Sequence, residues 1–509
     1  MKAADLPLHY NAVDIVERNL PARADKTAIY SAEREITFGA LSEEINRHGS
    51  GFRDLGVRFG ETVALLALDS VEWVGAYFGT IKIGAVALSL NTMLTPDEYR
   101  LMLADCRAKV LVCHDMFAET VAALRDDLPE LEHVLVIGSD EYRDWLAKAS
   151  TELETVATHR EDICCLNYSS GTTGEPKGIP HAHKDLPLTA QLWGVNVLGL
   201  TENDRTFAGA KLFFTFGTGG NLIFPFYVGA SCVLLAGSPR DVHNVFGTVD
   251  TFKPTVLYNA PTGYAMALAR EDLTEKYDLS SLRICVSAGE SLPAPIFEHW
   301  RERTGLDIVD GIGSTENYHI FLSNRPGDIR PGSSGKPFEG YEVRLVDDDG
   351  QDVPAGEVGN LWVKSETASL GYLHQYDKTR TTFRGEWLVT GDKYRMDEDG
   401  YYWHSGRSDD MLKVGGIWVS PVEVESTLLG HESVMECAVV GQEDQDGLVK
   451  PLAFVKLHEA FEESETQAKA LIAHCSDAMA SYKRPRWVEF VEELPKTATG
   501  KIQRFKLRG

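Results

Sequence analysis

Apolar runs of strand length alternate with helical patterns over much of this sequence, and this alternation restricts the fold more than any other feature. The strand-length runs lie at 62–68, 85–90 and 109–113, and the helical patterns between them lie at 71–83 and 96–105. The second helical pattern begins with a capping box, in which Thr95 is the N-cap, Pro96 the first helical residue and Glu98 the carboxylate. Strands that alternate with helices indicate βαβ units and a largely parallel sheet.

The alternation returns later in the chain and then gives way to another pattern. Strands are predicted at 282–287 and 307–310, separated by a helix that ends at Gly305. Beyond about residue 405 the sequence predicts a short α+β unit, with a helix capped by Ser420, strands near 437–440 and 452–457, and a helix at 466–479. Because 509 residues exceed one ordinary core, we predict an α/β protein with two domains, a large one at 1–406 built of layered mixed sheets and helices, and a small one at 407–509.

The charge balance excludes one class of partner. The chain has 50 basic and 76 acidic residues, a formal net charge of −26, and a field of that sign repels a nucleic-acid backbone. An anionic ligand must then be held by a local group of donors, which directs attention to glycine-rich loops. The eight cysteines show no zinc or redox spacing, and no stretch stays apolar for the length of a membrane span. We expect a soluble cytoplasmic protein with no nucleic-acid or membrane partner.

One glycine-rich segment, 168–178 (YSSGTTGEPKG), follows an apolar strand predicted at 163–167. Its hydroxyls, backbone N–H groups and lysine, Lys177, can surround phosphate oxygens at a strand end. A Walker P-loop requires Gly-Lys-Ser/Thr, whereas Lys177 is flanked by Pro176 and Gly178. Many loops are rich in Gly, Ser and Thr and bind nothing, but this combination favours a phosphate loop of another kind.

With this segment the chain resembles the acyl-adenylate-forming (ANL) superfamily of acyl-CoA synthetases, luciferases and peptide-synthetase adenylation domains. The resemblance extends over nearly the whole length and recurs as DGIGSTE at 310–316, Trp387 with TGD at 390–392, GRSDD at 406–410 and PKTATGK at 495–501. Five segments in the family's order are far more specific than any one of them. The resemblance implies ATP and Mg²⁺, a large adenylate-forming domain and a small mobile C-terminal domain.

The family pattern implies roles for the residues that match it. Glu316 would contact Mg²⁺ and Thr315 the α-phosphate, while Lys501 would place positive charge on the α-phosphate and the attacking carboxylate. Without the motifs, a solvated acid or a surface ion pair would be the simpler interpretation of such residues. The other nucleotide-binding residues that the resemblance implies are Ser169, Ser170, Gly171, Thr172, Thr173, Gly174, Lys177, Asp310, Gly311, Asp392 and Arg407.

The resemblance also implies a second conformation, in which the small domain rotates to admit a thiol. Asp409 matches the hinge position of the family. The segment 413–418 (KVGGIW), with Gly415, Gly416 and Trp418, would supply a surface for the pantetheine of CoA. Glycine pairs are usually turns, which is the plainer interpretation of this segment.

The segment 211–221 (KLFFTFGTGGN) places aromatic residues beside small ones, a combination that more often forms plain core than a pocket. Within the superfamily, this segment and 311–320 resemble the benzoate–CoA ligase branch. The acid-binding residues that the branch implies are Phe216, as an aromatic gate beside the phosphate, with Gly217, Gly313, His319 and Ile320.

Three further positions bear on specificity. Many relatives have an aromatic residue where this chain has Asp310, so adenine stacking is not implied there, and the aryl-acid branch tolerates aspartate. Asn317 and Tyr318 are candidates for contact with a ring substituent. An amide at Asn317 could bond an amino or hydroxyl group, so benzoate, 2-aminobenzoate and hydroxybenzoate all remain open.

We predict an AMP-forming, ATP-dependent aryl-CoA ligase of aromatic compound metabolism. The carboxylate of the aryl acid would attack the α-phosphate of ATP, and CoA would then displace AMP from the aryl-adenylate. Two alternatives stay open: an adenylating enzyme that loads a carrier-protein thiol, and a catalytically silent relative that serves as a binding module. The expected partners are an aryl carboxylic acid and CoA, and a homodimer is one assembly open to such a chain.

Overall fold

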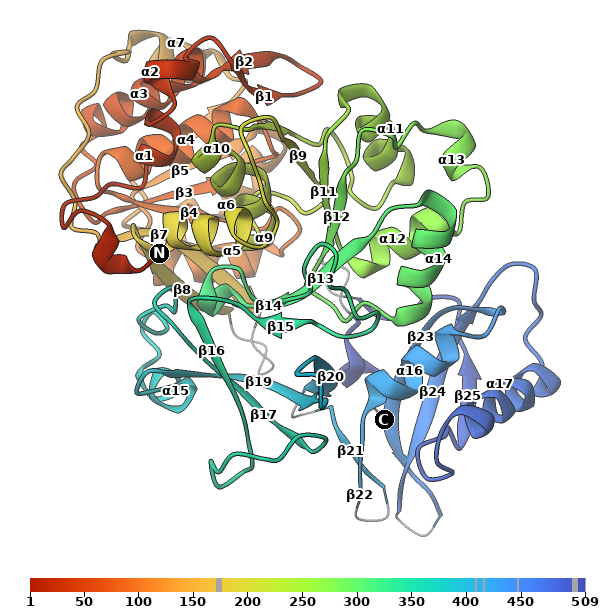
Figure 1. Cartoon of the computed structure of the whole chain (residues 1–509). Coiled ribbons are helices and arrows are strands. Elements are labelled where there is room, and N and C mark those ends of the chain that lie inside the picture. The colour runs from red at the N-terminus through yellow and green to blue at the C-terminus, as the bar shows by residue number, and fades with distance from the viewer. Residues whose placement is uncertain (171–175, 408–409, 415–416, 446–447, 497–501, 509) are drawn as a thin grey trace.

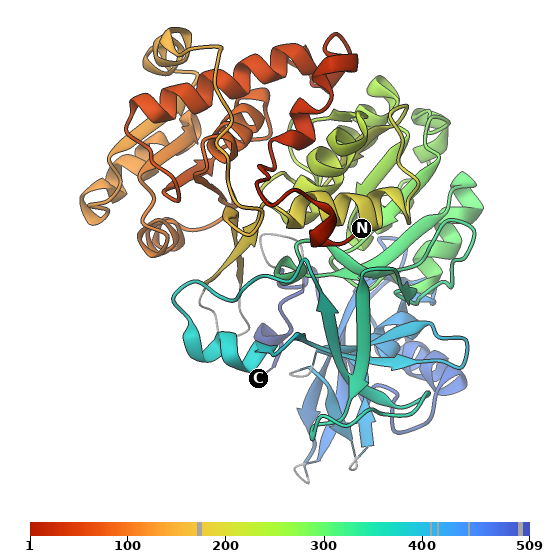
Figure 2. The same cartoon turned by 60° about the vertical axis from the view of Figure 1, so that its left-hand side comes forward.

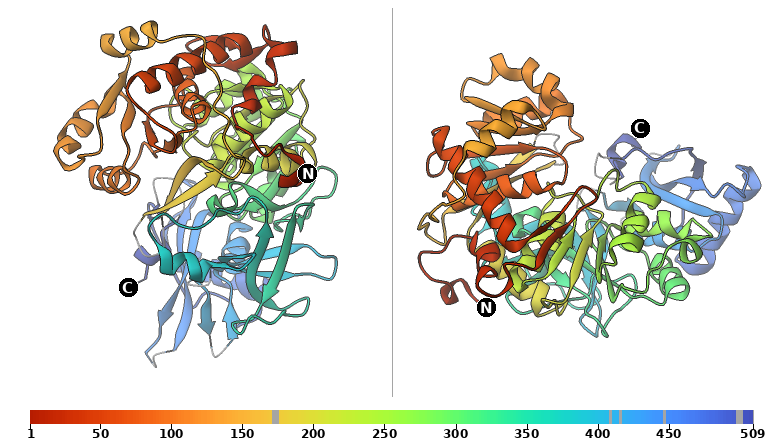
Figure 3. Two further views of the ribbon diagram at one scale, coloured as in Figure 1. Left: turned by 90° about the vertical axis from the view of Figure 1, so that its left-hand side faces the viewer. Right: turned by 90° about the horizontal axis from the view of Figure 1, so that it is seen from above.

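The computed structural model describes residues 1–509 apart from 171–175, 408–409, 415–416, 446–447, 497–501 and 509. Figures 1 and 2 show two sheets with helices in the N-terminal part, a third sheet beside them, and a smaller unit at the C-terminal end. Seen from above, in the right-hand view of Figure 3, the C-terminal unit lies beside the segment with α12 and α14 and apart from the N-terminal helices.

The first sheet has six strands in the order β6-β5-β3-β4-β7-β8. Its strands are β3 (Thr62–Leu66), β4 (Val86–Ser89), β5 (Val110–His114), β6 (His133–Ile137), β7 (Ile163–Ser170) and β8 (Pro176–Ala182). They are parallel except for the final pair, β7 and β8. The helices of this part are α1 (Asp14–Glu17), α2 (Leu20–Arg23), α3 (Phe38–Asp54), α4 (Val71–Lys82), α5 (Pro96–Asp105), α6 (Ala118–Leu124) and α7 (Asp140–Lys148).

The second sheet has nine strands in the order β15-β14-β13-β12-β11-β9-β10-β1-β2, parallel in the centre and antiparallel at both edges. Its strands are β1 (Thr27–Tyr30), β2 (Glu35–Thr37), β9 (Arg205–Ala208), β10 (Ser231–Val233), β11 (Val256–Asn259), β12 (Ile284–Ser287), β13 (Ile308–Gly313), β14 (Ile320–Ser323) and β15 (Lys336–Pro337). The helices are α8 (Asp185–Thr189), α9 (Thr215–Thr218), α10 (Phe224–Val228), α11 (Val242–Phe252), α12 (Pro261–Leu268), α13 (Leu273–Lys276) and α14 (Ala294–Thr304).

The third sheet is antiparallel and carries one helix, α15 (Tyr376–Thr382). Its strands are β16 (Tyr341–Val346), β17 (Val358–Ser365), β18 (Phe383–Arg384), β19 (Trp387–Met396) and β20 (Tyr402–Arg407). The C-terminal unit consists of β21 (Leu412–Val414), β22 (Ile417–Val419), α16 (Pro421–Leu429), β23 (Val434–Glu443), β24 (Val449–Leu457), α17 (Glu465–Ala478) and β25 (Trp487–Phe490).

The local signals in the sequence produce the predicted element boundaries. The Thr95 hydroxyl accepts the N–H of Glu98 while the Glu98 carboxylate accepts that of Thr95, so the predicted capping box is confirmed. The Ser420 hydroxyl caps α16 by accepting the N–H of Glu423, and Gly305 ends α14 with a φ of +71°. The prediction of strands alternating with helices is confirmed for the first two sheets. The predicted strand at 62–68 ends two residues earlier, at Leu66.

The apolar core is divided in the same way as the sheets. The largest cluster of buried side chains draws on residues from Leu6 to Tyr402, whereas a separate cluster lies within 412–475 and includes Val424, Val439 and Leu471. The C-terminal unit therefore buries apolar residues of its own. Among the described residues, no helix is both long and apolar enough to cross a membrane.

Candidate active site

The glycine-rich segment forms the far end of the β7–β8 hairpin. The two strands pair antiparallel, with Ser169 opposite Lys177 and Tyr168 opposite Gly178. Both strands therefore extend into the segment that the sequence predicts as loop. The tip of the hairpin, with Gly171, Thr172, Thr173 and Gly174, lies outside the described residues, as does the side chain of Ser170.

A tight turn connects β13 to β14 and carries the two predicted catalytic residues Thr315 and Glu316. One turn of 3₁₀ helix, Thr315–Asn317, is capped by Ser314, whose hydroxyl accepts the N–H of Asn317 at 3.3 Å. Tyr318 then adopts a φ of +68°, which is uncommon for a residue other than glycine. Such a conformation persists only where the surroundings hold it, so the contacts around this turn matter.

Three groups from other segments hold the turn. His181 Nε2 donates to the carbonyl oxygen of Thr315 at 2.7 Å, and the N–H of Ser369 donates to the carbonyl oxygen of Glu316 at 2.8 Å. The Tyr372 hydroxyl donates to Oε1 of the Glu316 carboxylate, also at 2.8 Å. The backbone of the turn and the carboxylate of Glu316 are thus both fixed by hydrogen bonds.

Cations gather near this carboxylate. The ammonium group of Lys177 lies 5.1 Å from the centre of the Tyr372 ring. Burial lowers the pKa of Lys177, Glu316 acts in the opposite direction, and the positive charges of Lys378 and Arg407 lower the pKa further. These residues come from β8, the turn after β13, α15 and β20, and they lie within electrostatic reach of one another. A local cation group thus opposes the negative field of the chain.

The predicted pair Asp392 and Arg407 lies at the end of the third sheet, opposite each other on β19 and β20. The carboxylate of Asp392 is 3.4 Å from the guanidinium of Arg407 and 3.6 Å from Nε2 of His404. Gly391 has a φ of +78°, and a Cβ there would lie 2.9 Å from the Arg407 guanidinium. An ion pair of this length with an exposed arginine contributes little to stability.

His319 lies in the middle of an aromatic cluster on the other side of the turn. Its ring centre is 4.6 Å from that of Phe224, 5.1 Å from Trp193 and 5.6 Å from Phe216. Tyr258 on β11 completes the cluster, 5.8 Å from Phe216. The predicted acid-binding residues Phe216 and His319, about a hundred positions apart in sequence, therefore lie against each other.

Glycines make room for this cluster. A Cβ on Gly219 would lie 2.5 Å from the ring of His319, and one on Gly313 would lie 2.6 Å from the carbonyl oxygen of the same residue. A Cβ on Gly217 would lie 2.2 Å from the carbonyl oxygen of Lys211. The two predicted glycines, Gly217 and Gly313, are thus positions where a side chain would collide with neighbouring backbone.

The protonation state of His319 follows from its burial. Burial lowers its pKa to about 3, so the ring is neutral near pH 7. Nε2 lies 3.4 Å from the carbonyl oxygen of Phe216, a group that can only accept, so Nε2 carries the proton. Nδ1 is then a bare acceptor, and within the described part of the chain it has no hydrogen-bond partner. Trp193 Nε1 and the Tyr258 hydroxyl are also buried and also have no hydrogen-bond partner among the described residues.

The remaining predicted residues near the turn occupy different environments. Asp310, in the middle of β13, is 5% exposed, and burial raises its pKa well above the usual range. Gly311 approaches the backbone of β14, because a Cβ there would lie 2.8 Å from the carbonyl oxygen of Leu322. Ile320 is buried in the main core at the start of β14.

The two candidates for contact with a ring substituent have other partners. The side-chain oxygen of Asn317 accepts a hydrogen bond from the Ser365 hydroxyl at 2.7 Å. The ring of Tyr318 packs edge-on against His181, with centres 5.2 Å apart. Nδ2 of Asn317 and the Tyr318 hydroxyl are buried and have no hydrogen-bond partner among the described residues, so contact of these two residues with a ring substituent stays a prediction.

Several predicted residues of the C-terminal part cannot be placed. Asp409, Gly415, Gly416 and Lys501 lie outside the described residues. The backbone of Trp418 pairs with that of Lys413 in the small β21–β22 hairpin, and its side chain is not described.

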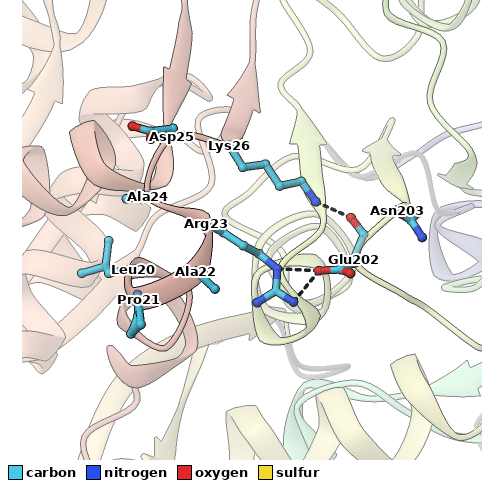
Figure 4. Close-up of a pocket in the computed structure, with 9 residues that line it drawn as sticks. All are labelled: Leu20, Pro21, Ala22, Arg23, Ala24, Asp25, Lys26, Glu202 and Asn203. Carbon is cyan, nitrogen blue, oxygen red and sulfur yellow. Dashed lines mark hydrogen bonds and ion pairs between the residues drawn. The ribbon is translucent and has the colours of Figure 1, made fainter.

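A surface cavity of about 470 Å³ lies far from these motifs in the sequence, between α2 and the segment after residue 200 (Figure 4). Arg23, Lys26 and Glu202 already have partners, since Arg23 pairs with Glu202 and Lys26 donates to the carbonyl oxygens of Glu202 and Gly229. Its lining lacks the motif residues described above, and its chemistry gives no reason to regard it as the reactive site.

The structure adds residues that sequence reasoning missed. His181, Ser369, Tyr372 and Lys378 surround the Thr315–Glu316 turn, and Trp193 and Tyr258 complete the aromatic cluster. Each is an ordinary residue in its own segment. The one available signal was a pair of histidines, His181 and His183, directly after the glycine-rich segment.

Comparisons with known proteins agree with this arrangement. Residues 16–373 match the model of the AMP-binding enzyme family, and residues 423–501 match that of the AMP-binding enzyme C-terminal domain. The benzoate–CoA ligase of Thauera aromatica is 45% identical over 99% of this chain and 97% of its own length. The crystal structure of the anthranilate CoA ligase AuaEII in complex with anthranoyl-AMP is 64% identical, with a TM-score of 0.98 over 100% of this chain and 98% of that one.

A benzoate CoA ligase from Burkholderia xenovorans LB400 is 41% identical, with a TM-score of 0.91 over 98% of this chain and 100% of that chain. These likenesses cover both parts of the chain, and they confirm the predicted fold class and the resemblance inferred from the five motifs. The chain belongs to the AMP-binding enzyme family, the acyl-adenylate-forming superfamily, and within it to the benzoate–CoA ligase branch.

Proposed function

We propose that this protein is an AMP-forming aryl-CoA ligase, with 2-aminobenzoate as its preferred acid. The observation that carries the proposal is the Thr315–Glu316 turn, which lies between a cation-rich phosphate hairpin on one side and an aromatic cluster on the other. A carboxylate on an aromatic ring and the α-phosphate of a nucleotide can meet only at such a junction.

The nucleotide would lie along the hairpin and the turn. Lys177 and the hairpin tip would hold the phosphates, with Thr315 at the α-phosphate. Asp392 can accept hydrogen bonds from both ribose hydroxyls, and Arg407, 3.4 Å away, can donate to the same sugar. Asp310 would lie at the base of the nucleotide, where its buried carboxyl group, whose pKa burial raises, can form a hydrogen bond.

Glu316 fits the single protein ligand that Mg²⁺ needs beside phosphate oxygens and water. The described residues contain no cluster of three or more acidic, histidine or cysteine side chains that could hold a metal ion without a nucleotide. Bound Mg²⁺ supplies charge neutralisation at the phosphates. The hydrogen bond from Tyr372 holds the Glu316 carboxylate in place for this role.

The reaction would proceed in two steps at one site. The acid carboxylate attacks the α-phosphorus and pyrophosphate leaves, and the CoA thiolate then attacks the acyl carbon and AMP leaves. We assign Lys501 to the first step and Gly415, Gly416 and Trp418 to the path of the thiol, with rotation at Asp409 between the steps. We also propose the division into domains at 1–406 and 407–509.

The aromatic cluster favours an acid with a hydrogen-bond donor on its ring. His319 offers a bare acceptor at Nδ1, and an unpaired buried acceptor costs free energy that a ligand donor removes. Benzoate has no ring donor, whereas 2-aminobenzoate has one beside the carboxylate. The 64% identity to a ligase solved with anthranoyl-AMP supports the same choice.

We also propose a cellular location and an assembly. All eight cysteines are buried thiols in the structure, which suits a reducing cytoplasm. We retain the homodimer as the assembly to test by light scattering.

The proposal is tested by measuring AMP release with CoA for benzoate, the three aminobenzoates, the hydroxybenzoates and medium-chain fatty acids. We expect 2-aminobenzoate to give the highest kcat/KM and aryl-CoA to accumulate with free CoA. Fatty acids that outperform every aromatic acid would overturn the aryl assignment. Adenylate formation without aryl-CoA release would indicate a carrier-protein acceptor, and absence of acid-dependent pyrophosphate exchange would indicate a binding protein.

A further inference from the structure

His181, near the end of β8, has two hydrogen-bond partners that can only accept. Nδ1 lies 2.9 Å from the Asp185 carboxylate, and Nε2 lies 2.7 Å from the carbonyl oxygen of Thr315. A ring that donates from both nitrogens is an imidazolium. The side chains of His181 and Asp185 are 0% and 2% exposed, so this is a buried charge pair.

The surroundings of Asp185 compensate for its burial. The Lys184 ammonium lies 2.8 Å from its other carboxylate oxygen, and the N–H of Ala182 donates at 3.0 Å to the oxygen that faces His181. Lys184 also donates to the carbonyl oxygen of Glu366. Burial lowers the pKa of His181, but the hydrogen bond and the charge of Asp185 outweigh it and raise the pKa above its ordinary value. A compensated network of this kind holds one geometry.

The carbonyl group that accepts from His181 Nε2 belongs to Thr315, the residue directly before the proposed metal ligand Glu316. The carbonyl of Thr315 belongs to the same planar peptide unit as the N–H of Glu316. A hydrogen bond to that carbonyl therefore fixes the plane of the peptide that joins Thr315 to Glu316. Because His181 lies on the strand that returns from the phosphate hairpin, it links the hairpin to this plane.

We propose that His181 is a positioning residue for adenylate formation, which holds the Thr315–Glu316 peptide in register with the phosphate hairpin. Asp185 orients the His181 ring, and the ring orients the peptide. The inference rests on the proposed function, because it concerns the step in which pyrophosphate leaves.

The two half-reactions should depend on His181 to different extents. Adenylation requires Thr315 at the α-phosphate and Glu316 at the metal, and a displacement of about 1 Å at such groups can cost on the order of 10² in rate. Thiol transfer takes place at the acyl carbon after pyrophosphate and its metal ion have left. A residue that merely stabilises the fold would affect both steps alike.

His183 provides a matched control. It lies two residues further on, is also buried, and accepts the N–H of Ala12 at Nδ1 at 3.0 Å, so it contacts the N-terminal segment in place of the turn. Burial lowers its pKa to about 4, and it is therefore neutral near pH 7. The same substitution at His181 and His183 separates the contact with Thr315 from the general loss of a buried histidine.

The experiment uses the full-length wild type and the variants His181→Gln, Asp185→Asn and His183→Gln. Acid-dependent ATP–pyrophosphate exchange is measured against Mg²⁺ concentration, and aryl-CoA formation is measured separately from synthetic aryl-adenylate and CoA. We expect His181→Gln and Asp185→Asn to lower the exchange rate by about 10- to 100-fold and to leave thiol transfer within about 3-fold of wild type. His183→Gln should leave the ratio of the two rates unchanged.

Equal losses in both half-reactions for His181→Gln, or the same selective loss in His183→Gln, would overturn the proposal. If neither His181→Gln nor Asp185→Asn folds, as judged by circular dichroism, the pair serves stability and the proposal also fails. The proposed function fails separately, when the wild type itself shows no exchange with any aromatic acid.

Discussion

The two halves of the candidate site each contain a fully buried histidine, and their environments differ in charge. On the phosphate side, His181 is paired with Asp185 and donates from both nitrogens. On the acid side, His319 is surrounded by aromatic rings, and burial lowers its pKa to about 3. The same side chain is thus a cation in one half and a neutral acceptor in the other, because its neighbours decide its protonation.

This difference indicates a division of labour. The phosphate side is built from charged groups with fixed hydrogen bonds, which suits transition-state charge that every acid substrate shares. The acid side is built from packed rings with unpaired polar atoms, which suits discrimination between substrates. Changes on the phosphate side should therefore alter the rate for all acids alike, and changes on the acid side should alter their ranking.

The largest expected effect tests the phosphate side. Glu316→Gln removes the charge proposed to hold the metal ion, and we expect acid-dependent ATP–pyrophosphate exchange to fall by about 10²- to 10³-fold. The loss should be similar for benzoate, 2-aminobenzoate and hydroxybenzoate, because the role proposed for the carboxylate is at the metal ion and the phosphates, which all three acids share. Glu357→Gln, at an exposed position, serves as the control. A changed order of acids in Glu316→Gln would contradict the division.

The next effect tests the acid side. His319→Leu removes the bare Nδ1 acceptor from the aromatic cluster. We expect the ratio of kcat/KM for 2-aminobenzoate to that for benzoate to fall by about 10- to 100-fold, because the ring donor loses its partner. The KM for ATP should stay near that of the wild type. An unchanged ratio, with equal losses for both acids, would show that His319 serves packing. His299→Leu, exposed on α14, is the control.

The same division explains what the sequence could predict. The polar half is accessible from motifs, since phosphate and metal chemistry dictates residue types in short segments such as 310–316. The sequence also predicts the capping box at Thr95 and the helix end at Gly305, because both signals are local. The sequence does not reveal His181 and Tyr372, because each bonds a residue that is 134 or 56 positions away. It does not reveal Tyr258, because the role of this residue depends on packing between β11 and α9.

The two residues before His319 show the same dependence on the fold. Asn317 and Tyr318 stand beside His319 in sequence and were predicted to contact a ring substituent. The positive φ of Tyr318 turns the chain at this point, the Asn317 side-chain oxygen bonds Ser365, and the Tyr318 ring packs on His181. Contact of these two residues with a ring substituent stays a prediction. Neighbours in sequence around a strained turn face different parts of the molecule, and a linear pattern does not contain that information.

A smaller effect tests one hydrogen bond on the phosphate side. Tyr372→Phe removes the 2.8 Å hydrogen bond to the Glu316 carboxylate. We expect the exchange rate to fall by about 10-fold, since a hydrogen bond to a charged group contributes about 1.5 to 3 kcal/mol. The ranking of acids should not change. Tyr376→Phe, four residues on and 70% exposed, is the matched control. Wild-type exchange in the Tyr372→Phe variant would show that this hydrogen bond does not hold Glu316 in position.

The smallest effect concerns stability and follows from the sign of the pKa shift at His319. Its pKa is about 3 in the folded protein and about 6.5 in the unfolded chain, so the unfolded chain binds one more proton between these values. Stability from this residue is therefore fully present above pH 6.5 and is lost as the pH falls toward 3. Between pH 7 and pH 5 the loss amounts to about 2 kcal/mol.

His319→Leu should abolish this contribution, while the buried neutral histidines His48 and His183 continue to act in the same direction. Thermal unfolding of wild type and variant at pH 7 and pH 5 measures the difference. We expect the midpoint to fall on acidification in both proteins, and to fall less in the variant. His181 contributes with the opposite sign, because its pKa is raised and its stabilisation is lost as the pH rises. If acid destabilised the variant as much as the wild type, His319 would not be the neutral acceptor on which the acid side depends.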